Sequence, residues 1–178
     1  MEVGLRKKDI VAAYTLLRIV VGVNYFNHGF VRLGNMGGFI DRMVETMQDT
    51  YLPEFLVRIN AAIVTPVELV VGFLITIGLF TRNALIVCFC LMVMLMYGIT
   101  LIQNWSTATD QLVYNICLFI LLAGLGYNTV SIDNYLKNKR GKKSNLDSSD
   151  RQETTISKFV RIFQVKNTRR KSLFRRFK

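Results

Sequence analysis

Two charged residues interrupt apolar stretches of the sequence, and they are the first candidates for chemistry. Arg18 lies within an apolar run over residues 10–31, and Glu68 lies within a second run over residues 59–80. A charge inside a membrane-length apolar segment is costly, so it usually faces a partner or a functional site inside the bundle. Counting ~1.5 Å per residue puts the two side chains about 6 Å apart in depth, within reach of an arginine. The sequence therefore predicts an Arg18–Glu68 ion pair.

The neighbours of this pair extend it into an expected pocket. At helical spacing, Arg18 shares one face with Tyr25, and both charges have small residues beside them that would let two helices approach closely. We expect a polar pocket between the first, second and fourth apolar segments, with Glu68 at its floor and His28 near its mouth. The candidate ligand-binding residues are Arg18, Tyr25, His28, Glu68, Tyr114 and Asn115.

Two interpretations of these residues remain open. A carboxylate and an imidazole at two depths could relay protons or hold a quinone headgroup. Alternatively, the ion pair only sets the register of two helices, and His28 only hydrogen-bonds a loop carbonyl.

Four apolar segments position these side chains, at residues 10–31, 59–80, 83–102 and 112–127. Each is close to the ~20 residues that a helix needs to cross the hydrocarbon core. The chain of 178 residues is 51% apolar, which excludes a disordered protein, and segment 83–102 has no polar face, which excludes a water-soluble bundle. The predicted fold class is all-α, an integral membrane four-helix bundle.

Basic residues in the short connections predict the orientation of this bundle. They precede the first segment, separate the second from the third, and follow the fourth, so the positive-inside rule puts both termini in the cytoplasm. Residues 34–58 then face outward. Their apolar residues recur at helical spacing, which predicts a short interfacial helix that ends before Pro53. We expect residues 103–110 to form the outer turn between the third and fourth segments.

The positive charge is concentrated in a C-terminal tail. Residues 1–136 form the expected membrane domain, 137–153 a polar linker, and 154–178 a basic amphipathic tail. Residues 137–178 hold 15 basic and three acidic residues, whereas residues 1–136 hold eight basic and nine acidic ones. The tail is expected to bind anionic lipid, with an acidic protein partner or ribosomal RNA as alternatives. Its candidate residues are Lys158, Arg161, Lys166, Arg169, Arg170, Lys171, Arg175 and Arg176.

The cysteines and the histidine argue against a metal or thiol redox site. The three cysteines form no C-x-x-C pair, and the chain has one histidine. We therefore expect no cofactor held by this chain alone and no metal site. A quinone is the cofactor that the pocket hypothesis would require.

Three sequence pieces in order resemble the DoxX family of small four-span membrane proteins. They are LLRIVVGVNYFNHGFVRL at 16–33, PVELVVGFLITIGLFTR at 66–82, and GLGYNTVSID at 124–133. The resemblance covers about residues 10–136 and implies a multi-pass protein of the bacterial cytoplasmic (inner) membrane. The family is similar to the DoxD subunit of thiosulfate:quinone oxidoreductase, and other members are linked to membrane redox complexes.

Three functional hypotheses follow from these features. In the first, the chain is a non-catalytic accessory or scaffold subunit that binds membrane lipids and other protein subunits, the latter through its tail. In the second, it is the membrane subunit of a quinone-linked oxidoreductase, with a ligand pocket around Arg18 and Glu68. In the third, it is a small carrier or proton pathway that uses Glu68 and His28. The first is placed ahead because the chain has no evident redox centre of its own, and enzyme activity stays open.

Overall fold

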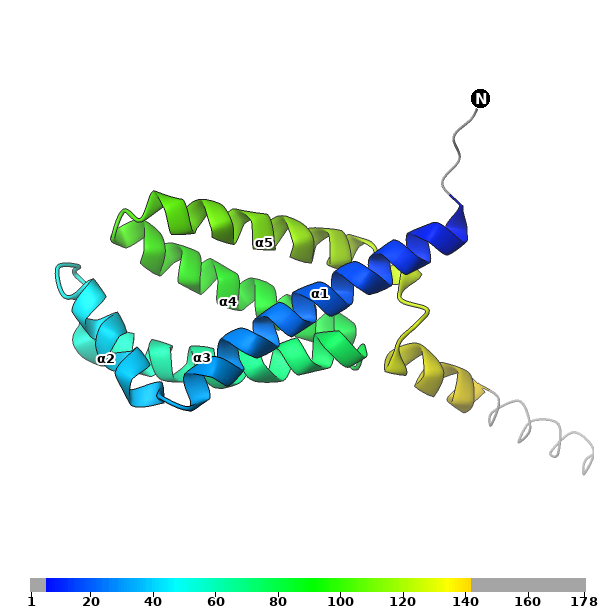
Figure 1. Ribbon diagram of the computed structural model, residues 1–178, viewed down its shortest axis with the longest axis horizontal. Coiled ribbons are helices and arrows are strands. Elements are labelled where there is room, and N and C mark those ends of the chain that lie inside the picture. Colours follow the sequence, from blue (N-terminus) through cyan, green and yellow to red (C-terminus); the bar gives the residue numbers. More distant parts are fainter. Residues whose placement is uncertain (1–5, 142–178) are drawn as a thin grey trace, which may run out of the picture. The chain divides into compact units, whose positions relative to one another are not determined.

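The computed structural model describes residues 6–141, and these residues are helical, without a strand among them. Most of the predicted linker and the whole basic tail lie outside the described residues. Residues 6–135 belong to one compact unit. Its elements, labelled in Figure 1, are α1 (Lys7–Leu33), α2 (Met36–Met47), α3 (Glu54–Ile77), α4 (Thr81–Leu101), α5 (Trp105–Ala123) and the 3₁₀ turn η1 (Leu125–Tyr127).

Four of these helices, α1, α3, α4 and α5, are long and apolar enough to cross a membrane. They correspond in order to the four predicted segments, so the all-α, multi-pass fold class is confirmed. The expected turn at residues 103–110 was predicted wrongly, because α5 begins at Trp105 and includes most of these residues. The Asn104 side chain accepts a hydrogen bond from the Thr107 backbone N–H at 3.2 Å. This N-cap starts the helix among polar residues that a hydropathy pattern assigns to a loop.

The predicted short helix between the first two spans is confirmed as α2. Its N-cap is Asn35, whose side chain accepts a hydrogen bond from the Gly38 N–H at 3.1 Å. None of its residues is fully buried, as expected for an amphipathic helix that lies across the end of a bundle. Pro53 then caps the start of α3, so the two helices stay separate.

The closest helix pair in the fold is α1 with α3, whose backbones touch through glycines. A Cβ atom added to Gly72 would lie 2.7 Å from the Phe26 Cα and 2.8 Å from the Gly22 carbonyl oxygen. A Cβ on Gly29 would lie 2.6 Å from the Leu69 backbone nitrogen. The small-residue faces expected on the first two spans are therefore the faces that pack together. In Figure 1, α1 crosses over α3 along this contact.

The apolar core fills the space between this pair and the α4–α5 hairpin. Its fully buried members include Ile75 of α3, Leu85 and Cys88 of α4, and Leu118 and Leu121 of α5. Each long helix also leaves an apolar face exposed, which is the pattern expected of helices that meet lipid.

Candidate functional site

Arg18 does not pair with Glu68, so the predicted ion pair is wrong. The Arg18 Nη1 donates hydrogen bonds to the carbonyl oxygens of Ile75 at 2.8 Å and Thr76 at 3.1 Å, and Nη2 donates to the Val130 carbonyl at 2.9 Å. The last carbonyls of a helix lack partners and carry partial negative charge, so a buried arginine stabilises the C-terminus of α3. Arg18 therefore has a structural role, because its hydrogen bonds connect α1 to the end of α3 and to the segment after η1.

A second set of polar contacts at the same end of the bundle joins the second and third sequence motifs. The Asp133 carboxylate accepts hydrogen bonds from the backbone N–H groups of Phe80 and Thr81, both at 2.8 Å, and from the Thr81 hydroxyl at 2.9 Å. The Asn128 amide also donates to that hydroxyl at 3.0 Å. Asp133 thus caps the N-terminus of α4 from a distant part of the chain. The turn at Thr81 in the second motif and Asp133 in the third motif therefore build structure at this end of the bundle.

Glu68 pairs instead with Arg32, near the other end of α1. The Arg32 Nη1 and the Glu68 Oε2 are 2.5 Å apart, with side-chain exposures of 26% and 4%. The Arg32 guanidinium also lies over the Phe39 ring, 4.5 Å from its centroid. The close contact of Gly29 with Leu69 explains the partner, because it brings the turn before Arg32 beside Glu68. The estimate that Arg18 and Glu68 lie about 6 Å apart in membrane depth was wrong. Helix α1 extends well beyond the end of α3, so Arg18 is level with the last turn of α3.

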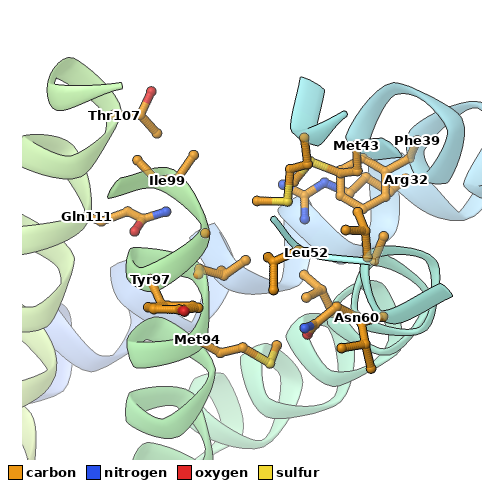
Figure 2. Close-up of a pocket in the computed structure, with 17 residues that line it drawn as sticks. Arg32, Phe39, Met43, Leu52, Asn60, Met94, Tyr97, Ile99, Thr107 and Gln111 are labelled. Carbon is orange, nitrogen blue, oxygen red and sulfur yellow. The ribbon is translucent and has the colours of Figure 1, made fainter. Parts of the chain in front are cut away.

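A cavity with a volume of about 360 Å³ lies beside Arg32. Its wall includes residues of α1, α3 and α5, the expected first, second and fourth spans, and also residues of α2 and α4, which the prediction did not include. Figure 2 shows Arg32, Phe39 and Met43 on one side and Thr107 and Gln111 on the other. The remaining lining residues are Met47, Leu52, Leu56, Val57, Asn60, Ala61, Val64, Met94, Leu95, Tyr97, Gly98 and Ile99.

None of the six candidate ligand-binding residues lines this cavity in the described part of the chain. Tyr25 and Tyr114 pack on each other in the core, with ring centroids 6.2 Å apart. The Asn115 amide donates to the Gln111 carbonyl of its own helix at 3.0 Å. His28 is exposed on another face of α1. Glu68, through its bond to Arg32, and Asn115, through its bond to Gln111, each contact a residue of the cavity lining, but the six candidates do not line this cavity together.

The polar residues that do face the cavity were not among the predicted site residues. They are Arg32, Asn60, Tyr97, Thr107 and Gln111. Gln111 is 8% exposed, and its Oε1 is buried without a hydrogen-bond partner among the described residues. For Asn60, an amide inside the predicted span 59–80 was the available signal, because uncharged polar residues in membrane helices usually face a partner or a cavity, whereas Gln111 lies just before the predicted span 112–127.

The titratable groups of residues 6–141 contain no cluster of three or more histidine, cysteine or acidic side chains that could hold a metal ion. Cys88 is buried, Cys117 is half-buried, Cys90 is exposed, and all three are free thiols.

The fold and this cavity define a multi-pass, all-α membrane protein. The model of the DoxX family matches residues 13–102, and the chain belongs to this family. The match includes the first two sequence motifs and ends at the last turn of α4. Comparisons with curated proteins and with solved structures find no match.

Proposed function

We propose that this protein is a ligand-binding membrane subunit that holds a neutral amphiphile of the quinone type in the cavity beside Arg32. The observation that carries the proposal is the cavity itself, about 360 Å³ with apolar walls and a few converging polar groups. Ligand sites in proteins have this composition and a volume of roughly 300–1,000 Å³. Apolar walls suit a headgroup that enters from the membrane with its tail in lipid.

The charges around the cavity favour a neutral headgroup over an anionic one. Arg32 is the charged residue in the lining, and Glu68 already balances it at 2.5 Å. The donors left on Arg32, together with the Asn60 amide, suit the carbonyl oxygens of a quinone. The buried Gln111 Oε1, which has no partner among the described residues, suits the hydroxyl of a quinol. The site therefore offers partners for both redox forms of such a ligand.

The electron-carrying centre is assigned to a partner subunit in this proposal. The chain supplies no C-x-x-C pair and a single histidine, so its own side chains are poor candidates for a redox centre. This role combines the accessory-subunit hypothesis with the quinone hypothesis. The resemblance supports a location in the bacterial inner membrane.

The single tryptophan provides a direct binding assay. Trp105 is the first residue of α5, two positions before the cavity residue Thr107. Titration of the purified full chain with a short-chain ubiquinone or menaquinone should quench its fluorescence in a saturable way. Bound ligand should also raise the unfolding temperature, because it binds only the folded state.

Two amides one turn apart on α5 give a matched pair of variants. Gln111→Leu should weaken quinone binding about fivefold, the effect of one lost hydrogen bond of ~1 kcal/mol. Asn115→Leu should bind as the unsubstituted protein does, because Asn115 does not line the cavity. Saturable binding that both variants reduce equally, or quenching that never saturates, would contradict the proposal.

A second role is proposed for the basic tail, on the strength of its charge. Residues 137–178 hold 15 basic and three acidic residues, whereas the membrane domain is nearly neutral. We propose that the tail binds anionic lipid at the cytoplasmic face, each basic residue near the surface contributing ~1 kcal/mol. A protein partner or ribosomal RNA remains the alternative occupant.

A further inference from the structure

A polar patch lies on the exposed face of α1. Asn24, Asn27 and His28 fall on successive turns and line a shallow depression together with Val31 and Arg32. Asn27 and His28 are exposed, and Asn24 is half-buried. None of these three side chains hydrogen-bonds to another residue between 6 and 141. Their amides and imidazole therefore lack a protein partner in this part of the chain.

This patch lies within the length of α1 that crosses the membrane. Asn27 is six residues before the end of the helix at Leu33, about 9 Å along its axis. Val23 and Phe30, one turn to either side, are exposed apolar residues suited to lipid. An amide that faces hydrocarbon without a hydrogen-bond partner is costly, and such groups in membrane helices usually bond to a neighbouring helix.

The exposed residues around Asn27 follow the spacing of a helix-pairing seam. Leu16, Val20, Val23, Asn27 and Phe30 are all exposed, and they succeed one another at steps of four, three, four and three residues. This is the heptad pattern by which two helices pack in a left-handed pair. Asn27 takes a position in the seam where a single asparagine fixes register and favours two strands.

We propose that this face of α1 pairs with α1 of a second copy of the chain, with Asn27 opposite Asn27 across a two-fold axis along the membrane normal. A carboxamide both donates and accepts hydrogen bonds, so the same side chain is complementary to itself. A second copy inserts with the same orientation and therefore presents Asn27 at the same depth. A two-fold contact of this kind uses one surface patch twice.

This dimer is independent of the proposed ligand. The seam residues are absent from the cavity lining, and Asn27 is on the face of α1 that does not contact α3. A failure of quinone binding would leave the dimer untouched, and the reverse also holds.

Disulfide scanning in native membranes tests the seam position by position. The three native cysteines are replaced in the full chain, and single cysteines are placed at Val23, Asn27, Phe26 or Ile116. Phe26 packs against Phe73 of α3, and Ile116 is an exposed residue of α5. Oxidation should crosslink two copies at positions 23 and 27, and much less at 26 and 116. Equal crosslinking at position 116, or a crosslink only to another protein, overturns the proposal.

A second measurement remains useful if a cysteine at position 27 itself weakens the pair. The dimer of the full chain is diluted in lipid vesicles, and its dissociation is followed by energy transfer between labelled copies. Asn27→Leu should weaken the dimer about three- to thirtyfold, the range for one membrane hydrogen bond. Asn27→Gln should restore most of the affinity, and Asn115→Leu should have no effect. An Asn27→Leu dimer as tight as the original one overturns the proposal.

Discussion

Removing either member of the Arg32–Glu68 pair should destabilise the bundle, but by unequal amounts. The Glu68 side chain is 4% exposed, so Arg32→Met leaves a buried carboxylate without its cation. Breaking a buried pair in this way costs about 3–5 kcal/mol. Glu68→Gln leaves an arginine that is 26% exposed, one residue before the end of α1, with the Phe39 ring still beneath it. Its long side chain can reach the interface, so we expect a loss of about 1–2 kcal/mol.

The double variant Arg32→Met/Glu68→Gln should recover part of this loss, because no charge is left unpaired. The double-mutant cycle formed by these two single variants and the double variant should give a coupling free energy of about 2–3 kcal/mol between Arg32 and Glu68. The same cycle for Arg18→Met with Glu68→Gln should give a coupling within about 0.5 kcal/mol. Arg18 bonds to the Ile75 carbonyl, seven residues and about 10 Å further along α3 than Glu68.

Both cycles use the same assay. The variants are purified in mild detergent, and unfolding by added denaturing detergent is followed by far-ultraviolet circular dichroism. The free energy of unfolding is compared for each single and double variant. If Arg18 couples to Glu68 as strongly as Arg32 does, or if Glu68→Gln costs as much as Arg32→Met, the assignment of partners is refuted.

Three further predictions concern the cap, the helix contact and the tail. Asp133→Ala removes the cap of α4 and should lower the free energy of unfolding by about 2 kcal/mol, whereas Asp110→Ala on the exposed side of α5 should change it by less than about 0.5 kcal/mol. Gly72→Ala forces α1 and α3 apart and should cost at least about 2 kcal/mol, while Gly37→Ala, with open space around it, should be neutral or stabilising in the same unfolding assay. Truncation after Asn138 should abolish salt-sensitive retention of the solubilised protein on beads coated with anionic lipid. Retention that survives truncation would assign lipid binding to the membrane domain instead.

The number and order of the spans could be predicted because membrane helices depend on length and hydropathy, which are local properties of the sequence. The helix ends could not all be placed this way. The residues after Trp105 are polar, and only the side chain of Asn104, which caps the helix, shows that α5 has already begun. Hydropathy averages over a window and does not register such a cap.

The candidate site was less predictable, because it depends on how the helices are offset along their axes. The facing stripes of α1 and α3 follow from helical periodicity, and the structure places them together. The displacement of α1 relative to α3 along their axes follows from glycine contacts such as Gly29 with Leu69. Counting residues from assumed membrane boundaries does not include this displacement. For that reason the sequence predicts both buried charges, Arg18 and Glu68, but it assigns Arg18 to Glu68 as its ion-pair partner in place of Arg32. The cavity also depends on where α2 lies, which no local pattern specifies.

The two arginines on one face of α1 have different consequences for a ligand. Both Nη atoms of Arg18 donate to backbone carbonyls, at the end of α3 and after η1, while its buried Nε has no hydrogen-bond partner among the described residues. Arg32 gives one nitrogen to Glu68 and also lines the cavity. A ligand that accepts hydrogen bonds can therefore be held at Arg32 without breaking the fold, whereas at Arg18 it would have to displace helix-capping contacts. This difference, together with the balance of charge by Glu68, is the reason to look for a neutral ligand at the α2 end of the bundle.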